Sequence, residues 1–432
     1  MAMSAIHNSG ARFAEPACHP GTRVEILKDL AAWSRDTQPD GKILWVYGLA
    51  GMGKSAIAQM FAGECNRDGN LGASFFFQRG HPECGTWHRL FVTIAYQLAF
   101  SVPELFLSVQ QAVEKDPLIV ARMMRLQFER LIVGPLKQMA VTEHQKLPVL
   151  VLDGLDECEG HQMQQEILRL LTSAIHEHKL PIRILIASRP EPHIREVLEA
   201  LAGEGAKTVS HFKVSADRSA YRDIALYLQE QFSKIHSEYL YRGIDLGAMW
   251  PSQDALNNLA KKSSGAFIYA STVVRFVGNQ YSHPHTRLAS VLNLDPKSTA
   301  PLDDLYAEIL SAIPEEYQNL RILHAIWMSS DSLDFDCDPE EIDLLLALPR
   351  GTSRLMLRGM HSVFEIPSIK LRGGYRESIT ILHKSFADYL CDSRRAKRWC
   401  ISAAQLQLDF LHSVIRLPSS QPLRDTARAF YK

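Results

Sequence analysis

The chain has 432 residues, of which 46% are hydrophobic and 22% charged, enough for roughly two to four domains with a large buried core. The formal net charge is −1 and the pI about 7.0, so the chain lacks the basic balance typical of DNA- and RNA-binding domains. The seven cysteines form no C-x-x-C pair, which argues against a zinc site and favours reduced thiols in a cytosolic or nuclear protein.

Two segments bear on targeting and membrane binding. Residues 1–12 lack the apolar core of a signal peptide. The most apolar stretch, residues 266–274, is too short to span a bilayer and is followed by Arg275, so we expect it to be a buried helix. The sequence therefore predicts a cytoplasmic protein that does not bind membranes.

The first half of the chain alternates short apolar runs with helical patterns. Thr22 and Glu25 have the spacing of a capping box and predict a helix that ends at Trp33, preceded by a tail over residues 1–19. Strand-like runs lie at residues 43–47, 73–77, 148–152, 183–187 and 208–214. Helical patterns between the second and third runs cover residues 87–100 and 121–139. The alternation predicts an α/β domain over residues 20–218, with a parallel sheet and helices on both faces.

Strand signals end near residue 218. Helical patterns follow at residues 219–234, 252–262 and 266–277. They predict an all-α lid domain over residues 219–295. Pro284, Pro296 and Pro301 mark a connector near its end.

The last part of the chain combines helices with a hairpin. Helices are predicted at residues 303–312, 315–328, 340–348 and 353–360, the third of them opened by Asp338 as N-cap and Pro339 at the first helical position. Two strands, at residues 367–371 and 378–382, are predicted to be joined by a turn at Gly373 and Gly374. This order is typical of a winged helix and predicts such a domain over residues 296–400. Residues 401–432 are predicted to be a C-terminal helical tail.

One motif carries the strongest functional signal. The pattern G-x-x-x-x-G-K-[ST] of a phosphate-binding P-loop is fitted by Gly48, Leu49, Ala50, Gly51, Met52, Gly53, Lys54 and Ser55. Its glycines let backbone N–H groups turn toward phosphate oxygens, Lys54 reaches the β- and γ-phosphates, and Ser55 offers a hydroxyl to Mg²⁺. The helix that follows directs its positive dipole end at the same anions. The motif predicts nucleotide binding.

A second element is the apolar run that ends in acidic residues at 153–157. Asp153, at the tip of the strand, is the candidate for holding Mg²⁺ through water. Asp156 and Glu157 lie just beyond, where a carboxylate can polarise water for attack on the γ-phosphate. The alternative is a strand that ends in a solvated acidic turn, which is less favoured downstream of a P-loop.

Ser188 and Arg189 follow another strand, at the edge where open α/β sheets place their ligands. Arg189 is therefore a candidate to sense the γ-phosphate or the acidic loop, because guanidinium groups bind phosphate with a forked geometry. A structural ion pair at the sheet edge is equally consistent with this position.

Together, the P-loop, the acidic run and the Ser188–Arg189–Pro190 sequence resemble a NACHT domain of the STAND signal-transduction ATPases. The Gly21–Thr22–Arg23 segment and residues 188–194 resemble the fungal, nephrocystin-like branch, and the resemblance covers roughly residues 15–395. It implies a clamp of ATPase core, helical lid and winged helix, closed by ADP and opened by ATP. It also implies that His383 contacts the β-phosphate of ADP.

The resemblance implies further that Thr22 and Arg23 line the adenine side, although a simple helix cap is as consistent with these residues. Where many relatives have Gly-x-Pro in the lid, this chain has Gly265, Ala266 and Phe267. Relatives usually add an effector domain and a repeat array, and neither is visible, so we expect a bare switch, a shortened relative or an incomplete gene model.

These features predict an ATP/ADP switch with Mg²⁺ and weak hydrolysis, which self-associates when ATP is bound and responds to unknown trigger and effector proteins. By resemblance, the setting is fungal nonself recognition or regulated cell death. Alternatives are a turnover ATPase of the AAA+ kind, a small-molecule P-loop kinase and a scaffold that no longer uses nucleotide. A Ras-like GTPase is disfavoured because the sequence has no Asn-Lys-x-Asp signature. A winged helix can bind DNA, but the neutral charge makes nucleic acid an unexpected partner.

Overall fold

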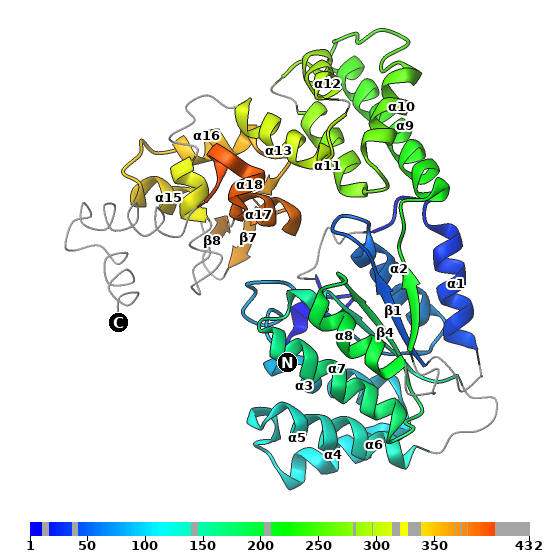
Figure 1. Cartoon of the computed structure of the whole chain (residues 1–432). Helices are drawn as coiled ribbons and strands as arrows, with labels where there is room; N and C mark the ends of the chain where they lie inside the picture. The colour runs from blue at the N-terminus through cyan, green and yellow to red at the C-terminus, as the bar shows by residue number, and fades with distance from the viewer. Residues whose placement is uncertain are drawn as a thin grey trace. The chain divides into compact units, whose positions relative to one another are not determined.

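The computed structural model describes residues 1–10, 17–36, 42–139, 146–202, 209–279, 282–295, 297–312, 320–326, 338–366, 368–371, 374–377 and 379–401. The chain divides into two compact units, Met1–Asp223 and Ile224–Lys432 (Figure 1). Each unit is described by itself below. The predicted tail after residue 401 and half of the helix predicted at residues 315–328 lie outside the described residues, whereas residues 320–326 of that helix are helical.

The first unit is built on a five-stranded parallel sheet. Its strands are β1 (Ile43–Tyr47), β2 (Leu71–Phe76), β3 (Val149–Asp153), β4 (Arg183–Ser188) and β5 (Val209–Lys213). Their order in the sheet is β2-β3-β4-β1-β5, and every neighbouring pair is parallel. The predicted α/β fold is confirmed, with each strand within two residues of its predicted bounds.

The strand order creates a switch point at the carboxyl edge of the sheet. The connection after β1 runs toward β2 on one side, whereas the connection after β4 runs toward β5 on the other. Tyr47 pairs with Ser188 in this register, and Asp153 pairs with Ala187, so β1, β3 and β4 end side by side. Open α/β sheets bind ligands in the crevice that forms at such a point.

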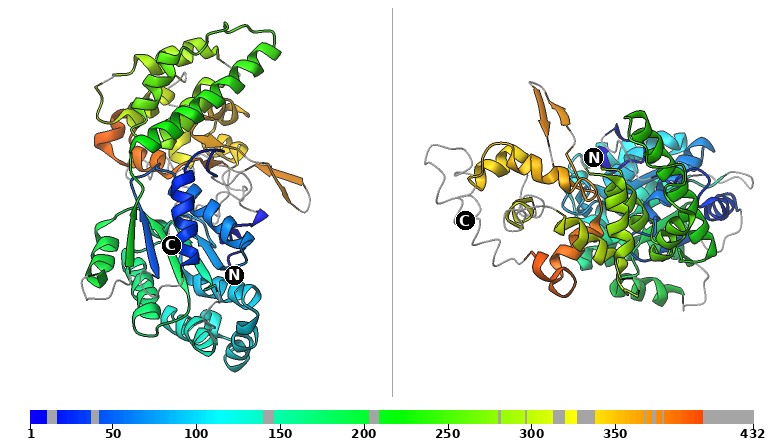
Figure 2. Two further views of the ribbon diagram at one scale, coloured as in Figure 1. Left: turned by 90° about the vertical axis from the view of Figure 1, so that its right-hand side faces the viewer. Right: turned by 90° about the horizontal axis from the view of Figure 1, so that it is seen from above.

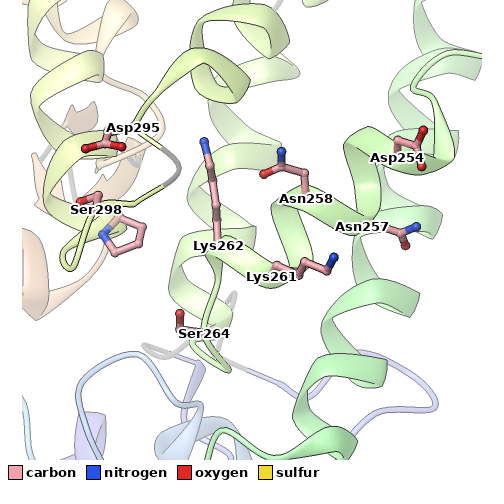
Figure 3. Close-up of a pocket in the computed structure, with 9 residues that line it drawn as sticks. Asp254, Asn257, Asn258, Lys261, Lys262, Ser264, Asp295 and Ser298 are labelled. Atoms are coloured by element: carbon pink, nitrogen blue, oxygen red, sulfur yellow. The ribbon is translucent and has the colours of Figure 1, made fainter.

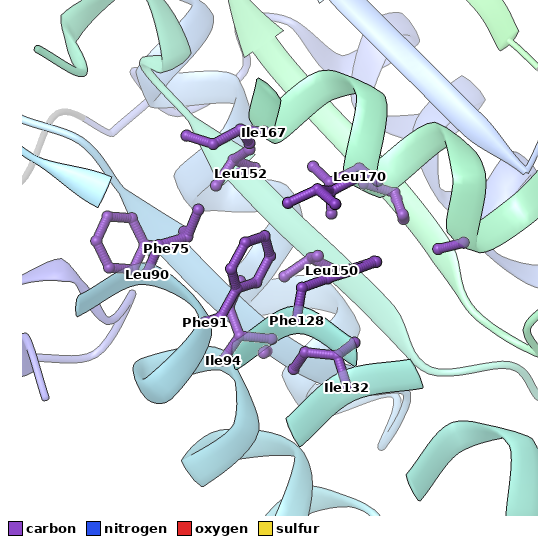
Figure 4. Close-up of a cluster of buried hydrophobic side chains, with 14 of the residues drawn as sticks. Phe75, Leu90, Phe91, Ile94, Phe128, Ile132, Leu150, Leu152, Ile167 and Leu170 are labelled. Carbon is purple, nitrogen blue, oxygen red and sulfur yellow. The ribbon is translucent and has the colours of Figure 1, made fainter. Parts of the chain in front are cut away.

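Helices cover both faces of this sheet. They are α1 (Val24–Arg35), α2 (Lys54–Arg67), α3 (Leu90–Ser101), α7 (His161–His176) and α8 (Pro192–Ala202). The helices α3, α7 and α8 share one apolar core with the sheet, whereas α2 contacts β3 and β4 and packs beside α1 (Figure 1). Figure 4 shows part of this core, in which Phe91 of α3 and Phe128 have ring centroids 4.9 Å apart. Full burial of such a side chain stabilises the fold by about 1.5–3 kcal/mol.

The helix predicted at residues 121–139 is broken in the structure. It consists of α5 (Met124–Phe128), a π-helical turn (Glu129–Val133) and α6 (Gly134–Gln138). Pro135 has no N–H to donate one turn back, and its ring crowds the carbonyl there, which the wider π turn accommodates. The preceding segment adds α4 (Phe106–Lys115) and short 3₁₀ turns at Trp87–Arg89, Pro103–Leu105 and Ile119–Ala121.

The predicted capping box at the start of α1 is wrong. The N-cap is Arg23, with φ of 57°, and no side chain caps the helix. The hydroxyl of Thr22 instead donates to the His19 carbonyl at 2.7 Å. The Thr22 hydroxyl is therefore engaged in the turn before α1 and does not cap the helix.

The N-terminal residues pack into the first unit. Ala2 and Ala5 are fully buried, the latter in a 3₁₀ turn (Met3–Ala5). The backbone N–H of Ala2 donates to Thr93 Oγ1 at 2.9 Å, and that of His7 donates to Ser74 Oγ at 3.0 Å. These bonds attach residues 1–7 to α3 and to the edge strand β2.

The second unit is mostly helical. Its helices are α9 (Arg218–Tyr241, which begins in the first unit), α10 (Gln253–Lys262), α11 (Phe267–Val277), α12 (Pro284–Asn293), α13 (Pro301–Ser311), α15 (Pro339–Leu345), α16 (Thr352–Gly359), α17 (Lys384–Cys391) and α18 (Ser393–Ala396), with a 3₁₀ turn at Lys397–Trp399. The predicted N-cap of α15 is confirmed, because the Asp338 carboxylate accepts the Glu340 N–H at 2.7 Å.

The predicted hairpin is displaced. Strand β7 (Ser368–Leu371) pairs with β8 (Gly374–Glu377), so the second strand begins at Gly374, four residues earlier than predicted. Only residues 372 and 373 separate the two strands, and two residues is the commonest length of a hairpin connection. The strand β9 (Thr380–Ile381) pairs instead with β6 (Phe364–Glu365). Figure 2 shows the β7–β8 hairpin, in orange, extending away from the helices of its unit.

No single helix among the described residues combines the length and apolar character needed to cross a bilayer. The segments Trp87–Ser101 and Pro103–Lys115 would meet that test only as a pair bent by 117°.

Candidate nucleotide-binding site

The P-loop lies between the end of β1 and the start of α2, at the switch point. Gly53 is the N-cap of α2 with φ of 87°, in the left-handed region that favours glycine, and no side chain caps this helix. A Cβ on Gly48 would lie 2.8 Å from the Val214 carbonyl oxygen, so only glycine fits where the loop passes the chain leaving β5. The loop backbone and the first turn of α2 thus have the form of a cradle for an anion.

Lys54 extends back over its own loop. Its Nζ donates to the carbonyls of Gly48 and Leu49, both at 2.9 Å. Burial lowers the pKa of Lys54, whereas the carboxylates of Asp156 and Asp153 act in the opposite direction. The ammonium group therefore lies at the mouth of the loop, where a phosphate oxygen can take the place of the two carbonyls. The neighbouring residue Leu49 is 72% exposed, whereas Lys54 is partly buried.

Arg23 reaches the P-loop from the N-cap of α1. Its side chain is buried, and its Nη2 donates to the Met52 carbonyl at 3.0 Å. Its backbone N–H donates to Asp223 Oδ2 at 2.9 Å. Burial lowers the pKa of Arg23, and Asp223 opposes that shift. Arg23 therefore supports the P-loop backbone, and Thr22 supports the turn before it.

The acidic loop follows β3 directly. Asp153, its last strand residue, is 4% exposed. Gly154, with φ of 70°, turns the chain into a 3₁₀ segment (Leu155–Glu157) and donates its N–H to the Ala187 carbonyl at 2.9 Å. That turn brings Asp156 and Glu157 back toward the carboxyl edge of the sheet. The carboxylate of Glu157 accepts the Arg79 N–H at 3.2 Å.

Arg189 pairs with Asp156. Its backbone N–H donates to Asp156 Oδ1 at 3.0 Å, and its Nε lies 3.4 Å from Oδ2. Ser188, just before it, accepts from Trp45 Nε1 at 2.9 Å and donates to the Arg189 carbonyl. Of the two contacts that the sequence left open for Arg189, γ-phosphate or acidic loop, the structure shows the one with the acidic loop. Ser188 forms hydrogen bonds that hold the chain next to Arg189.

The charged side chains described above all lie near Lys54. The charges of Asp156, Asp153, Arg189 and Glu157 all act on Lys54, so the carboxyl ends of β3 and β4 both supply charged groups to the P-loop. Ser55 lies in the first turn of α2 and is partly buried. In the described part of the chain no three His, Cys, Asp or Glu residues are grouped to hold a metal. Magnesium held by Ser55 and Asp153 would complete its shell with phosphate and water oxygens, which is how this ion usually binds. The residues fit that role.

His383 lies in the second unit, as the N-cap of α17. Its Nδ1 accepts the Ser385 N–H at 3.1 Å and lies 2.7 Å from Ser385 Oγ, which in turn lies 2.7 Å from the hydroxyl of Tyr306. A backbone N–H can only donate, so Nδ1 is the acceptor and the ring proton is on Nε2. The predicted contact between His383 and nucleotide stays a prediction.

Part of the chain is similar to a known protein family, and the chain as a whole is similar to several solved structures. Residues 21–189 match the family described as Nephrocystin 3, N-terminal. No curated protein matches the chain. Solved structures similar to it include a Walker-type ATPase of Pyrococcus abyssi, 13% identical with a TM-score of 0.40, covering 87% of this chain and 97% of that one. Cdc6p of Pyrobaculum aerophilum is 14% identical, with a TM-score of 0.37, covering 89% and 96% of the two chains. At such TM-scores the likeness says nothing about what this chain binds.

The nephrocystin match covers the P-loop, the acidic loop and Arg189. Sequence reasoning missed other residues that support the site. Arg79 follows β2, and Asp223 lies near the start of α9; neither belongs to a recognisable motif. Gln164 and His193 were also missed, although His193 falls in the run of residues 188–194 that carries the resemblance.

A polar cavity of about 480 Å³ lies in the second unit (Figure 3). It is lined by Asp254, Asn257, Asn258, Lys261, Lys262, Ser264, Asp295, Ser298 and Pro301. The Nζ of Lys262 donates to the carbonyls of Val291, Leu292 and Leu294. Lys262 therefore donates to the backbone carbonyls at the carboxyl end of α12, which is a structural role.

Proposed function

We propose that this chain binds ATP or ADP with Mg²⁺ in its P-loop and hydrolyses ATP weakly. The observation that supports this most is the arrangement around Lys54, where the acidic loop and Arg189 meet an anion cradle. Each group lies at the carboxyl edge of a different strand, so the site depends on the sheet topology and not on one motif.

In the proposed mechanism the loop N–H groups and Lys54 hold the β- and γ-phosphates. Ser55 and Asp153 would hold Mg²⁺, which would supply positive charge to neutralise the phosphates. Binding must draw Lys54 from the carbonyls of Gly48 and Leu49 to the phosphate oxygens.

The carboxylates then divide the remaining tasks. Asp156 orients Arg189 through two contacts, so it is committed to positioning. Glu157 is the residue that polarises the attacking water. Arg189 stabilises the charge on the γ-phosphoryl group while its bond to the attacking water forms and its bond to the departing ADP breaks.

We further propose that hydrolysis serves a switch of the NACHT or STAND type in the cytoplasm, with a winged helix in the second unit. ADP favours a closed monomer, ATP favours self-association, and trigger and effector proteins act on this equilibrium. The setting implied by the family resemblance is fungal nonself recognition or regulated cell death. Shifting such a switch from 1:99 to 99:1 requires about 5.5 kcal/mol of differential binding. One charged hydrogen bond from His383 supplies about 1.5–3 kcal/mol, so lid and partner contacts must add the rest.

Chromatography of the nucleotide released from denatured, freshly purified protein tests the proposal. We expect stoichiometric ADP or ATP in the wild type and none in Lys54→Ala. Lys115→Ala, at an exposed position in the same unit, is the charge-matched control. A wild-type chain that emerges empty and takes up no adenine nucleotide with magnesium would refute the assignment. Rapid steady-state hydrolysis would instead favour a turnover ATPase of the AAA+ kind.

A further inference from the structure

A buried glutamine links the acidic loop to the segment that carries Arg189. Gln164 lies in the first turns of α7 and is 3% exposed. Its Nε2 donates to the Cys158 carbonyl at 2.6 Å, and its Oε1 lies 2.6 Å from His193 Nε2. Cys158 directly follows Glu157, and His193 lies in the first turn of α8, shortly after Arg189. One side chain therefore joins two loops of the proposed site.

These hydrogen bonds fix the protonation of His193. A carbonyl oxygen can only accept, so the Gln164 amide presents its nitrogen to Cys158 and its oxygen to the imidazole. That amide oxygen also can only accept, so Nε2 of His193 carries a proton. Burial, followed by the neighbouring His161, lowers the pKa of His193 and favours the neutral ring with this single proton.

Helix α7 holds the same histidine in two further ways. The ring of His161 stacks on that of His193, with centroids 4.2 Å apart and planes inclined by 18°. The Nε2 of Gln165 donates to the His193 carbonyl at 3.4 Å. The ring and the backbone of His193 are thus both fixed to the helix that follows the acidic loop.

We propose that Gln164 and His193 are positioning residues that hold the acidic loop, and with it Glu157, in register with Arg189. The Asp156–Arg189 pair holds the residue before Glu157, and the Cys158–Gln164–His193 link holds the residue after it. The inference rests on the proposed ATPase function, because the groups held are those proposed to act on the γ-phosphate. A misplacement of about 1 Å can cost roughly 100-fold in rate.

Three variants of the full chain separate positioning from folding. Gln164→Leu removes both hydrogen bonds, and His193→Phe removes the donor but keeps a ring that can stack on His161. His193→Gln restores a donor. Gln162→Leu, at an exposed position on the same helix, is the matched control. Affinity for ATP and single-turnover hydrolysis are measured for each, with thermal melting to verify folding.

We expect Gln164→Leu and His193→Phe to bind ATP within about twofold of wild type, because the cradle at Lys54 is untouched. Hydrolysis should fall about 10- to 100-fold, by analogy with the loss of outer-shell groups that orient metal ligands. His193→Gln should recover part of the rate, and Gln162→Leu should match the wild type. Wild-type hydrolysis in the first two variants would overturn the inference and leave the proposed function intact, whereas a wild type that binds no nucleotide would overturn both.

If hydrolysis is too slow to follow, a spectroscopic measurement tests the hydrogen bond between Gln164 and His193. In protein labelled with ¹⁵N-histidine, with the resonance assigned by its loss in His193→Phe, His193 should show the Nε2–H tautomer. Gln164→Leu should shift the Nε2 resonance, because the hydrogen-bond acceptor of Nε2–H is lost. A proton found on Nδ1 alone, or a spectrum that Gln164→Leu leaves unchanged, would refute the link.

Discussion

Arg23 Nη2 donates to the carbonyl oxygen of Met52 at 3.0 Å. Arg23, which precedes the first strand of the sheet, therefore stabilises the backbone of the P-loop through a contact with one of its carbonyls. Carbonyls that point outward leave the loop N–H groups free to turn inward, toward a phosphate. The family resemblance implied that Arg23 lines the adenine side. The contact observed here is with the loop itself.

Replacing Arg23 by Met tests this support. We expect ADP affinity to fall by roughly tenfold or more, because a hydrogen bond from a charged donor contributes about 1.5–3 kcal/mol. Calorimetric titration of the nucleotide-free protein measures it. Arg67→Met, at the exposed end of α2, is the control. Unchanged affinity in Arg23→Met would show that the loop keeps its form without this bond.

The two acidic-loop carboxylates should respond differently to loss of charge. Asp156→Asn weakens the pairing with Arg189, and because this pair is largely buried we expect a loss of stability on the order of 1–3 kcal/mol together with loss of hydrolysis. Glu157→Gln should keep the fold and ATP binding but slow hydrolysis. Melting temperature and single-turnover rate measured on both variants check the division. Full hydrolysis by Glu157→Gln would show that a residue other than Glu157 polarises the attacking water.

The strands could be predicted from sequence because each is an uninterrupted apolar run. Strands of a parallel sheet are buried on both faces and need no alternation, which is why 43–47 matched β1 without change. The displaced hairpin shows the limit of this approach. Residues 374–377 are polar, and the pairing with β7 decides their structure.

Contacts between distant segments could not be predicted from local patterns. The sequence placed Asp156 and Arg189 at one sheet edge but could not decide whether they would touch each other or a phosphate. The Arg23–Met52 and Gln164–His193 bonds each join two segments that are 29 residues apart in the chain and leave no periodic signal. At Thr22, a residue type that usually caps helices proved misleading because Arg23 adopts the left-handed conformation.

The lowered pKa of His193 predicts a dependence of stability on pH. The unfolded chain binds a proton near pH 6.5, whereas the folded chain binds it only at lower pH. The free energy of unfolding should therefore decrease as pH falls below about 6.5. The charged neighbours are His161, which disfavours protonation, and Glu191, Glu196 and Asp156, which favour it.

Thermal melting of wild type and His193→Phe at pH 7.5 and 5.5 tests this sign. We expect the wild type to lose more stability between the two values than the variant does. Burial also lowers the pKa of His361, but His361 is present in both proteins and its contribution cancels. An equal loss in both proteins would contradict the prediction.

His383 offers a separation of two roles, helix cap and phosphate contact. As a cap, its Nδ1 accepts the Ser385 N–H, a task that asparagine also performs well. As a phosphate contact, it would use the proton on Nε2, which the shorter asparagine cannot place at the same point. His383→Asn should therefore keep the stability of α17, whereas His383→Ala should lose about 1 kcal/mol.

If the proposed clamp exists, both substitutions should speed ADP release and increase self-association, because both lack the Nε2 donor. Stopped-flow displacement of a fluorescent ADP and light scattering measure the two effects. Ser385→Ala is the control: it removes the hydroxyl beside Nδ1 but keeps the backbone N–H and the imidazole. An ADP off-rate that rises in His383→Ala but stays at the wild-type value in His383→Asn would mean that the histidine acts only as a cap, and the switch would then need another contact to report the bound nucleotide.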